Sequence, residues 1–409
     1  MAQRVRLRAP LVEAARRAIA SLGGAPLVRA ALAGEPPGAR VLWAAGKAAP
    51  AMARGAAEAL GDDLIGGLVI ARAPLAGETA PAPLQLFAAA HPFPDERSVR
   101  ATDALLDAAR RLGKNERAIF CLSGGASSLL GAPLSGLPVC ALATATRALL
   151  DGGAPIGEIN VVRRHLGRAL GGRLAQACAG ELEVLALSDV IGDDPAAIGS
   201  GPASPDPSTL DEARAIARQY RLSTEIEAAL ARAPETIKPG DPCFSRVRYR
   251  LLASPRTLLD AAAAEVGALG FQVTVREELV TGPVEIFAAE LGARAAGLAP
   301  GEALVAVGEP TVQVRGDGKG GRAQHLALLV AGALAQSDRL FLALGSDGSD
   351  GPTEAAGAIV DGDTYCPESE QALARFDAYS HLSERGCAIV TGPTGTNLTD
   401  LFVLARAPR

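Results

Sequence analysis

The stretch VLWAAGKAAPAMARGAAEAL, residues 41–60, couples a short apolar run to an Ala-rich helical pattern through Gly46 and Lys47. Apolar runs of the same kind, each followed by glycine and a helical pattern, recur at residues 67–71, 117–123 and 183–188. Runs of this length are typical of strands buried on both faces, and their alternation with helices indicates a parallel sheet. The first half of the chain is therefore predicted to be an α/β domain.

The second half carries its own series of strand-like runs. They lie at residues 247–253, 271–277, 302–308, 311–315, 339–345 and 387–392. The Pro-rich segment 233–244 precedes them and is the best candidate for a linker. We predict two α/β domains, because 409 residues are too many for one ordinary core. Residues 1–238 would form a Rossmann-like parallel sheet with helices on both faces, and residues 239–409 a smaller α/β domain, with the active site in the cleft between them.

Composition excludes several classes of function. With 48% hydrophobic and 21% charged residues, the chain has the composition of a soluble globular protein. A net charge of −5 without a basic stripe argues against nucleic-acid binding, and no apolar run approaches the roughly 20 residues of a membrane span. Six scattered cysteines without a C-x-x-C pair signal neither zinc nor disulfides.

The Arg-rich start of the chain superficially resembles a transit peptide. Apolar residues at helical spacing between Leu11 and Leu22, ended by Gly23 and Gly24, favour an ordinary first helix instead. We accordingly expect a cytoplasmic protein that binds neither nucleic acid nor membranes. A homodimer is a candidate assembly.

Two loops after predicted strands have the composition of phosphate-binding turns. Lys47 opens a helix, an unfavourable place for a cation unless an anion binds there too, and a merely solvated lysine is the equal alternative. The second loop, CLSGGASSLLGAP at 121–133, is rich in small residues that let backbone N–H groups surround an oxyanion. We favour such a cradle over a plain tight turn. Its candidate binding residues are Ser123, Gly124, Gly125, Ser127 and Ser128.

Acidic and amide side chains follow other predicted strands. Asp189 comes directly after the run 183–188 and is our choice for binding Mg²⁺ or accepting a proton, while Asp193 and Asp194 suit turn and cap roles. Asp347 lies in an acidic, glycine-rich stretch that does not match a calcium loop, so a metal-bound nucleotide or substrate hydroxyls fit it better. Glu309 and Asn397 complete the candidate binding residues.

The loop GDGKGGRAQHL, residues 316–326, supports two interpretations. Its glycines fit the G-x-G-x-x-G pattern of a dinucleotide-binding turn, for which the ribose-binding acid should lie about 20 residues further on. Asp347 stands 26 residues after Gly321, and Lys319 and Arg322 make the loop strongly cationic. Phosphoryl transfer requires such charges to neutralise the transferred group, so we favour it over hydride transfer.

Six motifs, in this order along the chain, resemble those of the class II glycerate 2-kinases, whose C-terminal part is called the MOFRL domain. They are GKAAPAMA, LSGGASSLL, SDVIGDDPAAIGSGPASPDPST, GEPTVQVRGDGKGGRAQHLAL, SDGSDGPTEAAGAIVD and GPTGTNLTDL. The resemblance implies ATP- and Mg²⁺-dependent phosphorylation of D-glycerate at its 2-hydroxyl. Because members have often been labelled hydroxypyruvate reductases, an NAD(P)H-dependent reductase is the alternative. A binding protein without turnover is the third.

The resemblance carries functional residues onto this chain. The functional lysine falls on Lys47, the functional arginine on Arg322, and the Ser-Gly-Gly loop on residues 123–125. We expect Lys47 and Arg322 on opposite walls of the cleft, converging on the transferred phosphoryl group, with Asp189 catalytic as well. The family usually reads G-G-R-N-Q-E, whereas this chain has Ala323 and His325 in place of the Asn and the Glu.

Overall fold

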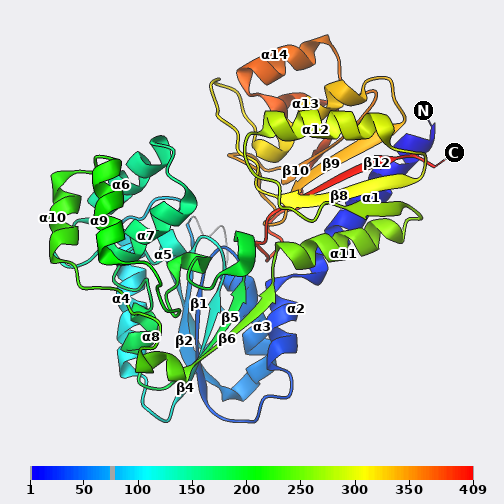
Figure 1. Cartoon of the computed structure of the whole chain (residues 1–409). Coiled ribbons are helices and arrows are strands. Elements are labelled where there is room, and N and C mark those ends of the chain that lie inside the picture. The colour runs from blue at the N-terminus through cyan, green and yellow to red at the C-terminus, as the bar shows by residue number, and fades with distance from the viewer. Residues whose placement is uncertain (1, 74–78, 409) are drawn as a thin grey trace. The chain divides into compact units, whose positions relative to one another are not determined.

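The computed structural model describes residues 2–73 and 79–408 and divides into two compact units, each built around one sheet (Figure 1). The unit of residues Gly24–Leu252 is called the first-sheet unit here. The second-sheet unit combines Met1–Gly23 with Ala253–Arg409. Described residues near both ends of the chain therefore belong to the same unit.

The first sheet is parallel, with the strand order β3-β2-β1-β4-β5-β6 that is typical of Rossmann-like folds. Its strands are β1 (Arg40–Ala45), β2 (Leu64–Arg72), β3 (Leu84–Ala89), β4 (Arg117–Leu122), β5 (Glu181–Leu187) and β6 (Val247–Ala253). Alternate side chains of β1 are buried on opposite faces: Trp43 packs with Leu105 of α4, while α3 covers the other face. The predicted strands at 41–46, 67–71, 117–123 and 183–188 are confirmed, and β3 was missed.

Helices cover both faces of this sheet and form an additional cluster beside it (Figure 1). Next to the sheet lie α2 (Gly24–Leu32), α3 (Ala49–Leu60), α4 (Glu96–Arg111), α5 (Ala126–Leu129) and α8 (Arg173–Ala177). The cluster consists of α6 (Val139–Asp151), α7 (Ile156–Leu166), α9 (Leu210–Gln219) and α10 (Thr224–Arg232). It has a core of its own that includes Leu149, Leu166 and Leu230.

The second sheet is mixed, in the order β11-β10-β9-β12-β8-β7. Its strands are β7 (Gln272–Val275), β8 (Glu302–Gly308), β9 (Arg339–Gly345), β10 (Gly357–Asp361), β11 (Ala388–Ile389) and β12 (Asp400–Arg406). Only the β7–β8 pair is parallel among the paired strands described. One face packs against α12 (Val284–Gly297) and α13 (Arg322–Leu334), with α14 (Pro367–Arg375) and α15 (Ala378–Glu384) beside α13.

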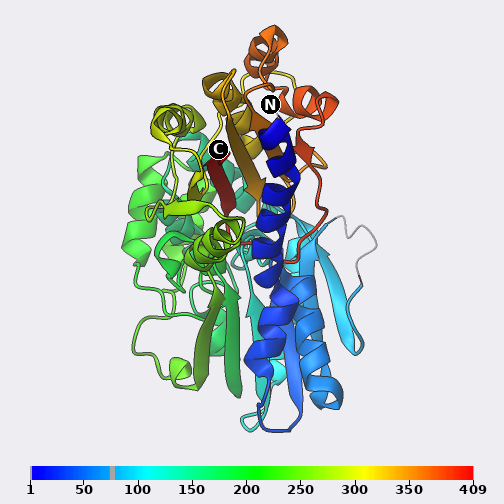
Figure 2. The same cartoon turned by 90° about the vertical axis from the view of Figure 1, so that its right-hand side faces the viewer.

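The other face of the second sheet is covered by α11 (Pro255–Gly267) and by the first helix, α1 (Ala2–Ser21), which Figure 2 shows in blue. Arg8 of α1 forms an ion pair with Asp361 of β10 at 3.0 Å and donates to the carbonyl oxygen of Ile359. The basic N-terminal segment is thus a helix, as predicted, and it completes the second-sheet unit. Among the described residues, no helix has both the length and the apolar character needed to cross a membrane.

Three expectations about the chain's course differ from the structure. Strand β6 joins the first sheet beside β5, so the compact units change at residues 23 and 252 instead of at the predicted 238. The Pro-rich segment 233–244 packs into the first-sheet unit, where the carbonyl oxygen of Ile237 accepts from the N–H of Asp206. Residues 311–315 form no strand: Thr311 makes an isolated bridge, and the following residues are irregular.

Candidate active site

The two predicted phosphate-binding loops meet at the carboxyl edge of the first sheet. β1 and β4 are neighbours, and the chain leaves them toward opposite sides of the sheet, which is where Rossmann-like folds bind ligands. The backbone N–H of Lys47 donates to the carbonyl oxygen of Gly124 at 3.0 Å, and that of Ser123 donates to Ala45 at 3.0 Å. The structure therefore brings Lys47 and the Ser-Gly-Gly loop together.

Glycines make this close approach sterically feasible. Gly46 has φ of +129°, and a Cβ there would lie 2.1 Å from the hydroxyl oxygen of Ser123. Gly125 has φ of +85°, and a Cβ there would lie 3.3 Å from Cγ of Lys47 and 3.2 Å from the ring of His91. The stem of Lys47 thus passes directly over Gly125, so a larger residue there would press against the lysine, and one at Gly46 would press against Ser123.

The hydroxyls of this loop are used to hold the loop itself. Ser123 is buried and accepts from the N–H of Ala48 at 3.0 Å, at the start of α3. Ser128 is also buried and donates to the carbonyl oxygen of Pro92. Ser127 is half-buried and shares a hydrogen bond of 2.8 Å with Ser200. Of the three, Ser127 is the serine with the most access to a ligand.

Asp189 leaves the same edge of the sheet, because it follows β5, the neighbour of β4. It is half-buried. Asp194 accepts from the N–H of Ala196 at 3.0 Å, which is the turn role predicted for it. Asp193 has one buried carboxylate oxygen with no hydrogen-bond partner in the described part of the chain. The described residues contain no group of three or more His, Cys, Asp or Glu side chains able to enclose a metal ion.

In the second-sheet unit, Arg322 is the first residue of α13 and forms ion pairs with two carboxylates. Its Nε lies 2.6 Å and its Nη2 3.0 Å from the two oxygens of Asp400, at the start of β12, and Nη2 lies 2.9 Å from Glu309, just after β8. Burial works against the charge, yet Asp400 and Glu309 raise the pKa of Arg322 further above its ordinary value. Nη1 makes no hydrogen bond to the residues described, so one edge of this fixed guanidinium remains available to a ligand oxygen.

The start of α13 is capped from outside the helix by Asp350. Its carboxylate accepts from the N–H groups of Ala323 at 3.1 Å and Gln324 at 2.8 Å. A Cβ on Gly321 would lie 2.1 Å from a carboxylate oxygen of Asp350, so the contact requires glycine there. Burial, together with the charge of Asp400, raises the pKa of Asp350 to about 7.

Sequence reasoning missed the roles of Asp350 and Asp400. Asp350 belongs to the same acidic, glycine-rich stretch as Asp347, and Asp400 belongs to the last of the six motifs, so neither stood out as a candidate. One local signal existed: the N-cap residue of α13 is Gly321, which has no side chain to accept from the first N–H groups of the helix, so an acceptor from elsewhere is needed.

Asp347 and Asn397 lie at the same edge of the second sheet as Arg322. Gly345 and Gly308, at the ends of β9 and β8, both pair with Asp400. Asp347 follows β9 and accepts from the N–H and the hydroxyl of Ser349 at 2.9 and 3.0 Å, and its charge contributes to raising the pKa of Asp400, after burial. Asn397 is buried just before β12. Glu309, Asp347 and Asn397 therefore gather around one sheet edge.

The two positions that depart from the resembled motif face the interior of the second-sheet unit. Ala323 is fully buried among the core residues beneath α13. His325 is 6% exposed and stacks on Phe376, with ring centroids 4.9 Å apart. Burial lowers the pKa of His325 below its ordinary value. The replacement at 325 is accommodated by ring stacking.

The glycines of the loop 316–321 serve packing against the chain itself. A Cβ on Gly316 would lie 2.3 Å from the carbonyl oxygen of Arg375, and one on Gly318 would lie 2.5 Å from Asp377. The N–H of Lys319 donates to Asp377 at 2.9 Å. Because no strand precedes this loop and its glycines admit residues 375–377, it lacks the strand–turn–helix context of a dinucleotide site.

Comparison with known proteins places these features in context. A family model described as a domain of unknown function, DUF4147, matches residues 11–234, and the MOFRL family model matches residues 302–400. The chain is 37% identical over 383 residues to a Thermotoga maritima protein named D-glycerate 2-kinase, with 89% of each chain covered. A relative in Agrobacterium vitis, 35% identical over 386 residues, carries a provisional hydroxypyruvate reductase name; 90% of this chain and 87% of that one are covered.

The fold is also similar to that of a solved structure. The crystal structure of a glycerate kinase from Thermotoga maritima superimposes with a TM-score of 0.87 at 33% identity. The match covers 98% of this chain and 99% of that chain. Both units therefore have counterparts in a protein of that name.

Proposed function

This chain belongs to the glycerate 2-kinase family that combines the DUF4147 and MOFRL regions, and from that membership we propose that it phosphorylates D-glycerate at the 2-hydroxyl with ATP. The observation that carries the proposal is the match to a D-glycerate 2-kinase over nearly the whole chain. The products would be ADP and 2-phosphoglycerate.

The local chemistry supports phosphoryl transfer over hydride transfer. The turn after β1 holds Gly46 and Lys47 and lacks the G-x-G-x-x-G pattern that lets a dinucleotide pyrophosphate approach the backbone. In the one loop with that pattern, at 316–321, Gly316 and Gly318 pack against residues 375–377 and Gly321 packs against Asp350. The edge of the first sheet carries Lys47, and the edge of the second sheet carries Arg322. A fixed cation suits the negative charge that develops on a transferred phosphoryl group.

We propose that Lys47 and Arg322 neutralise phosphoryl charge. Lys47 would neutralise phosphoryl oxygens as a compact charge, and Arg322 would present its Nη1 edge while Glu309 and Asp400 hold its other nitrogens. The Ser123–Ser128 loop would hold the substrate carboxylate or a phosphate through its backbone N–H groups, with Ser127 as the accessible hydroxyl. Asp347 and Asn397 would contact substrate or nucleotide hydroxyls.

Mg²⁺ fits the acidic residues of the first-sheet unit. In nucleotide sites this ion is usually held by one or two carboxylates together with phosphates and water, so a larger protein cage is unnecessary. Asp189 follows β5, and Asp193 in the same loop has a buried carboxylate oxygen without a partner among the described residues. When bound, the ion would neutralise phosphate charge. Asp189 would hold it or take the proton from the 2-hydroxyl.

The proposal is tested by running two assays on one preparation. With ATP, Mg²⁺ and D-glycerate, we expect ADP and 2-phosphoglycerate, with the phosphate position read by phosphorus NMR. With NADH or NADPH and hydroxypyruvate, we expect no consumption of the nicotinamide. Nicotinamide oxidation without ADP formation would show a reductase instead. Thermal stabilisation by D-glycerate or ATP with neither reaction would show a binding protein.

A further inference from the structure

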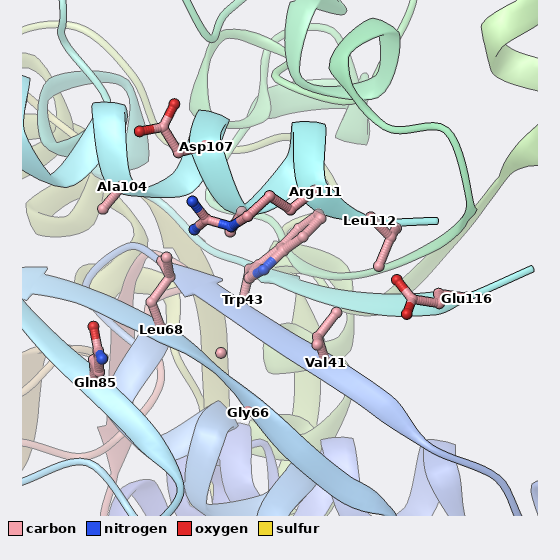
Figure 3. Close-up of a pocket in the computed structure, with 12 residues that line it drawn as sticks. Val41, Trp43, Gly66, Leu68, Gln85, Ala104, Asp107, Arg111, Leu112 and Glu116 are labelled. Carbon is pink, nitrogen blue, oxygen red and sulfur yellow. The ribbon is translucent and has the colours of Figure 1, made fainter. Parts of the chain in front are cut away.

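A cavity of about 370 Å³ lies in the first-sheet unit between α4 and the sheet, away from the loops described above (Figure 3). It lies at the start of the strands, beside Val41 and Gly66, whereas the proposed site lies at their ends. Ligand sites in proteins begin at roughly this volume, so the cavity suits a small molecule.

A glycine in β2 helps to keep the cavity open. Gly66 pairs with Val41, and a Cβ built on it meets no atom within 4 Å. Beside this gap, the sheet contributes Val41, Trp43 and Leu68, and α4 contributes Ala104 opposite them. The floor and the roof of the cavity are therefore apolar.

Two nitrogen donors lack hydrogen-bond partners at this cavity. The Trp43 side chain is only 1% exposed, and its indole N–H makes no hydrogen bond to the residues that the structure describes. The indole nitrogen keeps a small accessible surface, so a ligand acceptor can reach it. Arg111, at the end of α4, is exposed and has neither an ion pair nor a hydrogen bond within the described chain. Figure 3 shows Arg111 reaching over Trp43, with the guanidinium and the indole nitrogen toward the same side.

The carboxylates at the rim already have partners. Asp107 pairs with Arg110 at 3.0 Å and points away from the sheet in Figure 3. Glu116 accepts from the N–H of Gly113 at 2.7 Å. The cation of Arg111 is the one charged group lining the cavity whose partner the described chain does not supply.

We propose that this cavity binds a small carboxylic acid with a compact apolar body. The carboxylate accepts hydrogen bonds from the guanidinium of Arg111 and the indole N–H of Trp43, and the apolar body packs between Leu68 and Ala104. This site is separate from the proposed site for D-glycerate and ATP.

Trp43 is the single tryptophan of the chain, so its fluorescence reports on this cavity. The full-length protein is titrated with hexanoate and with 3-phenylpropanoate, and with hexylamine as a probe of opposite charge. We expect a saturable change in Trp43 fluorescence with at least one acid and none with the amine. No saturable change with either acid at millimolar concentration, or an equal response to the amine, overturns the proposal.

Matched variants locate the binding. Arg111→Ala should weaken binding of the acid at least tenfold, whereas Arg110→Ala, which removes the neighbouring arginine paired with Asp107, should leave it unchanged. Ala104→Leu should abolish binding by filling the cavity, with circular dichroism to show that the variant is folded. Unaltered binding in Arg111→Ala, or an equal loss in Arg110→Ala, contradicts the assignment. Kinase turnover is measured on the same samples. Its outcome tests the proposed function alone, because the cavity is separate from the site for D-glycerate and ATP.

Discussion

The two cations proposed to act on the phosphoryl group are positioned in opposite ways. The backbone N–H of Lys47 donates to the carbonyl oxygen of Gly124, and the stem of its side chain packs over Gly125. Arg322 is held in position by its guanidinium, which forms hydrogen bonds to Asp400 and Glu309. The difference teaches that one chemical role can be built by different means, and that Arg322 in addition neutralises a buried carboxylate, Asp400.

Arg322→Ala is expected to have the largest effect. Loss of an arginine that stabilises a transferred phosphoryl group lowers turnover by about 10³–10⁵. Asp400, 4% exposed, would lose its partner, so we also expect a loss of roughly 2–4 kcal/mol in unfolding free energy. The lower end of this range allows for the partial exposure of Arg322, which weakens the ion pair by solvent screening. Coupled ADP assays and urea denaturation measure the two effects, with Arg315→Ala as control. Near-normal turnover in a folded protein would rule out the role.

Lys47→Ala is expected to separate activity from stability. Removing one electrostatic stabiliser lowers turnover by about 10²–10³, while the backbone hydrogen bond to Gly124 is retained, so we expect a smaller loss of unfolding free energy than in Arg322→Ala. The exposed Lys114 supplies the control variant, Lys114→Ala. If both cations act on one transition state, the double variant loses less than the product of the single losses. Losses that multiply fully would mean that the two side chains contribute without coupling.

The buried Asp350, at the start of α13 beside Arg322, should make the unfolding free energy depend on pH. Its pKa is raised from 3.8 to about 7, so the folded protein binds this proton more tightly than the unfolded chain. The resulting stability is complete below pH 3.8 and is lost as the pH rises through 7. Between pH 5 and 8, the unfolding free energy should fall by roughly 2–3 kcal/mol more in the wild type than in Asp350→Asn. Parallel pH profiles from urea denaturation would refute this.

The smallest expected effect comes from alanine substitutions at two adjacent glycines, Gly320 and Gly321, which test the contact between Asp350 and the start of α13. Gly321→Ala would push against Asp350 and should cost about 1–3 kcal/mol of unfolding free energy. At Gly320 the nearest atoms lie 3.5 Å from an added Cβ, so Gly320→Ala should change stability much less. Thermal and urea unfolding of both variants decide the matter. Equal effects would mean that Asp350 does not hold the start of α13.

The surroundings of Lys47 could be predicted from the sequence better than those of Arg322. Lys47 and the loop 123–128 each follow a strand of one parallel sheet, and parallel strands bring their carboxyl ends to one edge. Local pattern was therefore enough to bring them together. Arg322 was identified as a cation, but its partner Asp400 lies 78 residues away on another element, and no local pattern pairs them.

By itself, the sequence determined the α/β class, most strands of the first sheet, the first helix and the family motifs. These follow from local periodicity, from glycine turns and from residue identity. Only the tertiary structure decided that α1 completes the second-sheet unit, that β6 joins the first sheet, that residues 311–315 form no strand, and that Asp350 caps α13. The physical reason is that the sheet a segment joins, and the carboxylate that meets a helix start, depend on contacts between residues far apart in the chain.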